Sequence, residues 1–228
     1  MSRALRTAVG GMVYHVLNRA NARLPLFAKH SDYAAFERVL GEARAYCDVP
    51  LLAYCVMPNH WHLVVQPRRD GDLSRFVGWL TLTHTQRWHS HHHTVGLGHL
   101  YQGRFKSFPV QEDDHLLTVC RYVERNPLRA GLVDRAEDWR WGSLWRREYG
   151  DAEARTLLAD WPTPRPRGWL SFVNAAQSLA EEEALKHSTQ RGSPFGAEVW
   201  VKDTVQRLGL EMTVRPRGRP KKHAEKGS

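Results

Sequence analysis

The sequence has few cysteines and no long apolar run. Its 228 residues include three cysteines, Cys47, Cys55 and Cys120, which are widely spaced and form no Cys-x-x-Cys pair. This spacing argues against a zinc knuckle and indicates reduced, partly buried thiols. No stretch approaches the ~20 apolar residues that span a bilayer. The N-terminus also lacks an apolar segment followed by a small-residue cleavage site. We therefore expect a cytoplasmic protein with no membrane partner.

Acidic residues are outnumbered by basic ones. Lys and Arg total 33 against 24 Asp and Glu, so the formal net charge is +9. A bias of this size favours a polyanionic partner, nucleic acid first and an anionic membrane second. A basic protein with a merely soluble surface is the alternative.

Hydrophobic periodicity predicts an α+β domain. Alternating or continuous apolar runs predict strands at 12–19, 51–57, 60–66 and 101–111. Apolar residues at helical spacing predict helices at 31–47, 72–92 and 112–126. We expect Ser31 to cap the first helix and Pro127 to help end the third. The first six elements match the ferredoxin-like βαββαβ pattern, an antiparallel sheet with helices on one face, and a further helix follows.

The chain divides into three parts. Residues 1–150 form the main domain, whose tryptophan-rich end (128–150) is expected to pack as an extension of the core. Residues 151–214 begin with the Pro- and Arg-rich linker WPTPRPRGW and continue as a helical extension, with helices expected near 170–187 and 197–210. Residues 215–228 have almost nothing apolar to bury, so we expect this tail to be disordered alone.

The stretch MPNHWHLVVQP (57–67) places His60 and His62 on either side of Trp61. Alternate residues of a strand share one face, so the two imidazoles point the same way and Trp61 points to the other side. Two imidazoles on one face can hold one divalent metal ion. In a chain with 13 histidines they can equally be two ordinary histidines.

A second group of polar residues lies on the third predicted helix, in RYVERNP. Tyr122 and Asn126 are four residues apart and therefore share a helical face. Asn offers a neutral oxygen to a metal, and Tyr offers a hydroxyl that can attack phosphorus. The alternatives are an amphipathic tyrosine at a core boundary and an asparagine that ends a helix.

Three fragments carry a resemblance to a known family. MPNHWHLVVQP, YQGRFKS and YVERNPLRAGLV, in this order and at this separation, resemble the single-tyrosine transposases of the HUH class. Within that class the chain is most similar to the REP-associated tyrosine transposases. The resemblance covers roughly residues 10–150. The C-terminal segment GSPFG to WVKDTVQRLGLE and the basic tail also resemble that subgroup.

The resemblance implies roles for four residues. His60 and His62 stand where the family has its metal-binding histidines. Tyr122 stands in the place of the catalytic tyrosine, and Asn126 in the place of a polar third metal ligand, Asn or Gln in relatives. The family's fold and activity are a ferredoxin-like palm that cleaves and rejoins single-stranded or hairpin DNA, with REP-like palindromes as substrates. The resemblance favours Mg²⁺, with Mn²⁺ as an alternative.

These residue types suit that chemistry. Rejoining a cut phosphodiester without external energy requires that the bond be conserved in a covalent intermediate. A tyrosine ester of the 5′ phosphate does this and leaves a free 3′ hydroxyl that can attack it later. A divalent ion polarises the scissile phosphate and neutralises charge in the transition state.

Several basic residues are candidates for DNA contact. Arg104 and Lys106, expected on the fourth strand, suit a DNA groove, although charge also protects an edge strand. Arg125 and Arg129 flank Asn126 and are candidates to hold a phosphate near the site. The segment RPRGRPKK resembles an AT-hook, in which Arg217, Gly218 and Arg219 lie in a minor groove. A generic basic tail is the alternative.

The remaining histidines favour ordinary roles. His15, on the first strand, can point toward the same site, where we expect a structural or supporting role. His89, His91, His92 and His93 suit a solvated helix end, because a run of adjacent side chains cannot all face one ion.

The sequence thus predicts an enzyme, a metal-dependent transposase and endonuclease of a bacterial, nucleoid-associated kind. The alternatives are a DNA-binding regulatory or structural protein without cleavage activity, and another HUH nuclease such as a replication initiator. The protein is expected to be a monomer, or a homodimer that exchanges the tyrosine helix.

Overall fold

The structure is a computed structural model that describes residues 8–215. The main domain contains β1 (Val13–Arg19), α1 (His30–Cys47), β2 (Leu51–Met57), β3 (His60–Val65), α2 (Asp72–His91), β4 (Lys106–Val110), α3 (Asp114–Arg129) and α4 (Ser143–Tyr149). The extension contains α5 (Ala152–Arg155), α6 (Trp169–Asn174), α7 (Leu179–Arg191), α8 (Glu198–Leu208) and α9 (Glu211–Val214). Two short 3₁₀ helices span Asn21–Arg23 and Ala136–Asp138.

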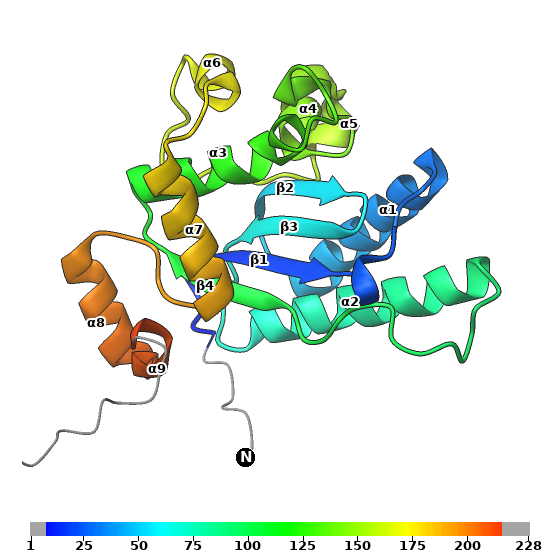
Figure 1. Cartoon of the computed structure of the whole chain (residues 1–228), viewed down its shortest axis with the longest axis horizontal. Coiled ribbons are helices and arrows are strands. Elements are labelled where there is room, and N and C mark those ends of the chain that lie inside the picture. Colours follow the sequence, from blue (N-terminus) through cyan, green and yellow to red (C-terminus); the bar gives the residue numbers. More distant parts are fainter. Residues whose placement is uncertain (1–7, 216–228) are drawn as a thin grey trace, which may run out of the picture.

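The four strands form one antiparallel sheet in the order β2-β3-β1-β4. This is the strand order of the ferredoxin-like fold, and it confirms the predicted βαββαβ arrangement. The hairpin between β2 and β3 turns at Pro58 and Asn59, as their turn-forming character predicts. As expected, α1 and α2 cover one face of the sheet. The further helix α3, whose place the sequence did not indicate, lies on the other face (Figure 1).

Each face of the sheet has its own apolar core. Phe36 of α1, Phe76 of α2 and Trp61 of β3 are fully buried together on one face. The opposite core joins β4 and α3 to the extension, whose Trp169 and Val173 are fully buried in it. The extension therefore completes the core on the side of the sheet that carries α3.

Two predicted helix limits on α1 and α3 were wrong. Helix α1 begins at His30, and the carboxylate of Asp32 accepts hydrogen bonds from the amides of Ala28 and Lys29, so Ser31 is not the cap. Helix α3 continues past Pro127 to Arg129. Proline removes one backbone donor, and the side-chain amide of Asn126 takes its place by donating to the carbonyl oxygens of Tyr122 at 2.8 Å and Val123 at 3.5 Å.

Two other elements differ from their predicted extent. The predicted helix at 170–187 is split into α6 and α7, because Ser178 and Glu181 form a capping box that starts a new helix. Strand β4 begins only at Lys106, so Arg104 lies in the preceding loop and not on a strand. No helix within residues 8–215 has the length and apolar character needed to cross a membrane.

Candidate functional site

The sheet face that α3 covers presents the two histidines of β3. His60 and His62 lie opposite Arg19 and Leu17 of β1, and alternation places all four side chains on that face. Trp61 points to the other face and is fully buried in the core with α1 and α2. The strand periodicity of the sequence therefore predicted this arrangement correctly.

The Nδ1 atoms of both imidazoles are engaged in hydrogen bonds. His60 Nδ1 lies 2.7 Å from Oδ1 of Asn59, and His62 Nδ1 lies 2.9 Å from Nε2 of the buried His15. An amide oxygen only accepts hydrogen bonds, so His60 carries its proton on Nδ1 and its Nε2 has a free lone pair. When His62 donates to His15, its Nε2 is free as well. Such partners orient imidazoles that bind metal ions.

Burial keeps these imidazoles neutral. It lowers the pKa of His60 to about 4 and that of His15 to about 3, and it holds the pKa of His62 well below its usual value. The neighbouring imidazoles and the guanidinium groups of Arg19 and Arg129 add to the effect on His62. Neutral imidazole is the form that binds a cation.

Tyr122 comes to the same place from α3. Its ring stands edge-on to that of His62, with the centroids 5.8 Å apart, and the guanidinium carbon of Arg129 lies 5.0 Å from the Tyr122 ring centroid. Only 6% of Tyr122 is exposed, and that part faces a cavity. Within residues 8–215, no hydrogen bond holds its hydroxyl group.

A buried carboxyl group fixes α3 in this position. Glu124 accepts hydrogen bonds from the hydroxyl of Ser143 at 2.6 Å and from the indole N–H of Trp169 at 2.7 Å. Burial raises its pKa. Through Glu124 the helix is tied both to α4 and to the extension, which constrains the rotation of Tyr122 about the helix axis.

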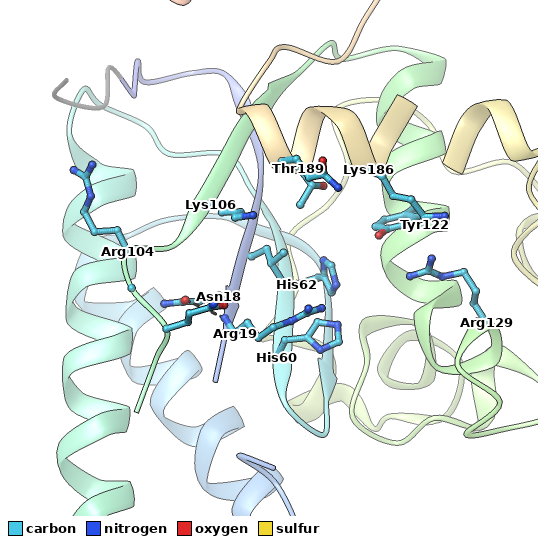
Figure 2. Close-up of a pocket in the computed structure, with 14 residues that line it drawn as sticks. Asn18, Arg19, His60, His62, Arg104, Lys106, Tyr122, Arg129, Lys186 and Thr189 are labelled. Carbon is cyan, nitrogen blue, oxygen red and sulfur yellow. Dashed lines mark hydrogen bonds between the residues drawn. The ribbon is translucent and has the colours of Figure 1, made fainter. Parts of the chain in front are cut away.

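The cavity between the sheet, α3 and α7 has a volume of about 580 Å³. Its lining residues are Leu17, Asn18, Arg19, His60, His62, Gln102, Gly103, Arg104, Lys106, Tyr122, Arg129, Lys186, Thr189 and Gln190 (Figure 2). Five of these are Arg or Lys, and none of the described lining residues is Asp or Glu. A concave surface lined by positive charges attracts anions, and the phosphate groups of DNA are the anions that best suit such a surface.

The structure brings together most of the residues singled out from the sequence. His60, His62 and Tyr122 line one cavity, as do the predicted DNA contacts Arg104, Lys106 and Arg129.

Asn126 is buried beside this cavity and does not line it. Its Oδ1 accepts a hydrogen bond from Nη2 of Arg129 at 2.9 Å, and its amide group serves the helix backbone. Arg125 lies elsewhere, with its guanidinium on the carbonyl oxygens of Val173 and Asn174 at 3.2 and 2.8 Å. Its predicted place near a phosphate in the site is therefore wrong for this conformation.

Three predicted residues of the tail, Arg217, Gly218 and Arg219, fall outside the described residues. The histidine run behaves as a helix end, with α2 stopping at His91. Two of its members, His91 and His92, have ring nitrogens within 4.8 Å of each other and of a carboxylate oxygen of Asp32. This group is a second candidate metal site.

Sequence reasoning missed several cavity residues. Arg19 could have been predicted from the sequence, because it lies two residues after Leu17 on β1 and therefore points to the same face of the sheet. Lys186 and Thr189 could not have been predicted, because it is the tertiary path of the extension that brings α7 over the sheet (Figure 1).

Comparisons with known proteins agree with this architecture. A family model described as "Transposase IS200 like" matches residues 8–126, just over half of the chain. A Haemophilus influenzae protein named as a REP-associated tyrosine transposase is 25% identical over 118 residues. That match covers 48% of this chain and 65% of the relative, so the chain spans less than two thirds of its length.

A solved REP-associated tyrosine transposase bound to a REP hairpin is similar in structure. The TM-score is 0.50 at 19% identity, over 78% of this chain and 93% of that one, which supports the same fold. The family match covers the sheet, both histidines and Tyr122. The chain therefore belongs to the family of IS200-like transposases.

Proposed function

We propose that this protein cleaves and rejoins single-stranded or hairpin DNA through a 5′-phosphotyrosine intermediate on Tyr122. One observation carries the proposal: a tyrosine and two neutral imidazoles, drawn from a helix and a strand, line one cation-rich cavity with no carboxylate among its described lining residues. A site built only to bind DNA has no need for this combination.

The reaction exchanges one ester for another. The Tyr122 oxygen forms a bond to phosphorus and loses its proton to solvent, while the bond from phosphorus to the 3′ oxygen breaks and that oxygen is protonated. A 3′ hydroxyl then attacks the tyrosine ester in the reverse sense and joins the strands. Cleavage and rejoining thus need no external energy source. Edge contact with His62 and the guanidinium of Arg129 hold the phenol at the cavity wall.

The residues present fit a divalent cation. The Nε2 atoms of His60 and His62 are the donors that their Nδ1 hydrogen bonds leave free. We assign the third ligand to Oδ1 of Asn126, which Arg129 must release first. A bound ion supplies neutralisation of charge on the scissile phosphate. Mg²⁺ is our choice and Mn²⁺ the alternative, since a partly hydrated site with an amide oxygen suits both.

The DNA partner is inferred from charge and from relatives. The cavity cations Arg19, Lys106 and Arg129 suit a phosphate backbone. The names of the relatives refer to REP sequences, and one is bound to a REP hairpin. We therefore propose REP-like hairpins with single-stranded flanks as substrates of this chain.

A single chain supplies all the proposed catalytic residues. Tyr122 and His62 of the same chain have ring centroids 5.8 Å apart, so an exchange of α3 between subunits is not needed to assemble the site. We propose that the protein acts as a monomer. Its domains are then the catalytic part at 1–150, the helical extension at 151–214 and a DNA-binding tail at 215–228.

The test determines which end of the cleaved strand becomes covalently attached to the protein. The protein is incubated with Mg²⁺ and hairpin oligonucleotides that carry randomised single-stranded flanks, labelled at either the 3′ or the 5′ end. Covalent transfer of the 3′ label to protein, abolished by Tyr122→Phe and by EDTA, is the expected result. Tyr149→Phe is the matched control, because Tyr149 is exposed and lies outside the cavity. Tight binding with no adduct under Mg²⁺ or Mn²⁺ would instead support a DNA-binding protein without cleavage activity.

A further inference from the structure

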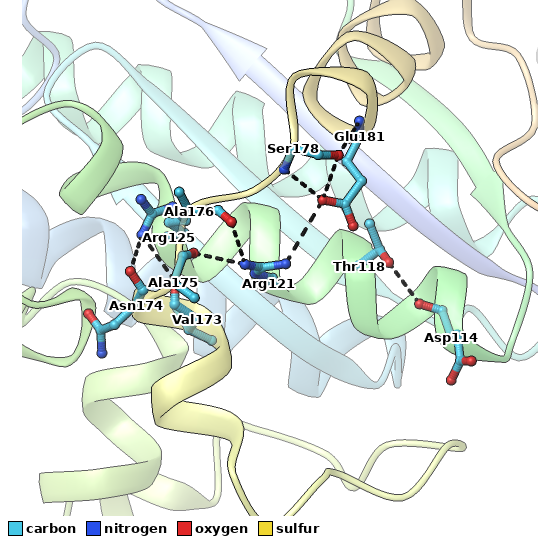
Figure 3. Close-up of polar contacts among 10 residues, drawn as sticks. All are labelled: Asp114, Thr118, Arg121, Arg125, Val173, Asn174, Ala175, Ala176, Ser178 and Glu181. Carbon is cyan, nitrogen blue, oxygen red and sulfur yellow. Dashed lines mark hydrogen bonds and ion pairs between the residues drawn. The ribbon is translucent and has the colours of Figure 1, made fainter.

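Helix α7 of the extension is fastened to the helix that carries Tyr122. Arg121 of α3 donates to the carbonyl oxygens of Ala175 and Ala176 at 2.8 and 3.0 Å, and the next turn's Arg125 donates to those of Val173 and Asn174 (Figure 3). Four consecutive carbonyl groups before α7 are thus held by two arginines of α3. These contacts hold the segment that leads into α7, and Oε2 of Glu181 on α7 itself lies 4.0 Å from Nη1 of Arg121.

This fastening brings Lys186, Thr189 and Gln190 of α7 into the cavity lining, opposite the sheet. Figure 2 shows Lys186 and Arg129 on the Tyr122 side of the cavity, with Thr189 at its upper edge. The Oγ1 atom of Thr189 is buried and has no hydrogen-bond partner among the described residues. The family match ends at residue 126, so it assigns no role to α7.

One carboxylate bridges the two cations next to Tyr122. Oε2 of Glu182 lies 3.0 Å from Nζ of Lys186 and 3.6 Å from Nη1 of Arg129. Both cations hold the pKa of Glu182 below its usual value. The side chain of Glu182 is only 18% exposed, whereas its partners remain open to the cavity.

We propose that Arg129 and Lys186 form a phosphate-binding site for the DNA strand, in which Glu182 occupies the place of the phosphate in the free protein. This inference rests on the proposed function and extends it to residues of the extension. Carboxylate and phosphate oxygens accept the same charge-assisted hydrogen bonds from Arg and Lys. A phosphate brings more oxygens and more charge than a carboxylate, so it displaces Glu182 when the strand enters.

If this phosphate-binding site exists, substitutions of Lys186 and Glu182 should change the affinity for DNA in opposite directions. Lys186→Ala removes a phosphate contact and weakens binding of a single-stranded hairpin oligonucleotide about fivefold, and it lowers the slope of log affinity against log salt by about 0.7. Glu182→Gln removes the competing anion and tightens binding about threefold at low salt. A salt bridge that merely stabilises α7 would make both variants bind more weakly.

The chain offers a matched control pair. Glu198 and Lys202 of α8 form the same kind of ion pair, four residues apart at 2.7 Å, and both are exposed outside the cavity. Lys202→Ala and Glu198→Gln change the net charge by the same amounts as the test variants. Binding is measured by fluorescence anisotropy over a range of salt concentrations, and the thermal midpoint of each variant checks folding.

The outcomes separate this inference from the proposed function. If wild type forms the Tyr122 adduct but the Lys186 and Glu182 variants bind as their controls do, the phosphate site is refuted and the enzyme stands. If no adduct forms but the two variants change affinity in opposite directions, the phosphate site stands and the cleavage proposal fails. Weaker binding by Glu182→Gln at an unchanged thermal midpoint also refutes the inference.

Discussion

His15 determines which nitrogen of His62 is available to a metal ion. Its Nε2 lies 2.9 Å from Nδ1 of His62, and both residues are buried and neutral. Replacing His15 with Phe keeps an aromatic ring against Phe108, whose centroid lies 4.8 Å away, but removes the acceptor. His62 then loses the partner that keeps its proton on Nδ1.

Loss of such a partner lowers metal affinity by roughly 10- to 100-fold. This corresponds to about 1.4 to 2.7 kcal/mol of binding free energy. The hydrogen bond is buried on both sides, so water cannot replace it without entering the core, and we expect a value toward the upper end. His15→Gln retains an oxygen acceptor and should recover part of the affinity.

Calorimetric titration with Mn²⁺ measures this effect without any DNA. The measurement is made in a background of His91→Ala and His92→Ala, which removes the second candidate site near Asp32. His62→Ala in the same background defines the signal of the cavity. If His15→Phe binds Mn²⁺ as tightly as the background protein while His62→Ala does not bind, the orienting role of His15 is refuted.

Burial lowers the pKa of His84 to about 4, against 6.5 for an ordinary histidine, so its contribution to stability is present above pH 6.5 and is lost as the pH falls toward 4. Chemical denaturation at pH 6.5 and at pH 4 measures the free energy of unfolding of each protein. Between these two values the free energy of unfolding of wild type should fall by about 3 kcal/mol more than that of His84→Gln. An equal fall in both proteins would contradict this role of His84. Mixing His62→Ala with Tyr122→Phe should restore no adduct, since one chain holds the whole site; recovered activity would demonstrate exchange of α3. Removing residues 215–228 should weaken duplex binding and reduce its salt dependence, and unchanged affinity would eliminate the minor-groove hypothesis.

The parts of the site that follow local periodicity could be predicted from the sequence. The alternation of β3 placed His60 and His62 on one face, and the four-residue spacing placed Tyr122 and Asn126 on one face of α3. These patterns depend on residues close in sequence, so no tertiary information is needed. The strand order could be anticipated because few topologies fit a βαββαβ pattern.

The mispredicted features have two kinds of cause. Some depend on contacts between residues that are distant in sequence, and one depends on a side-chain amide that takes the place of a missing backbone N–H group. Pro127 did not end α3, because the amide of Asn126 serves the carbonyl that proline leaves without a donor. Arg125 lies outside the site because its guanidinium group donates hydrogen bonds to two carbonyl oxygens of the extension. Lys186 entered the site for a similar tertiary reason, with no signal in its own sequence neighbourhood.

The most direct test of the central claim locates the covalent bond. The adduct with hairpin DNA is digested with nuclease and trypsin, and the peptides are analysed by mass spectrometry. Trypsin cuts after Arg121 and Arg125, so we expect the four-residue peptide 122–125 to carry a nucleotide joined through its 5′ phosphate to Tyr122. A nucleotide attached to any other residue, or an adduct that persists in Tyr122→Phe, would contradict the account.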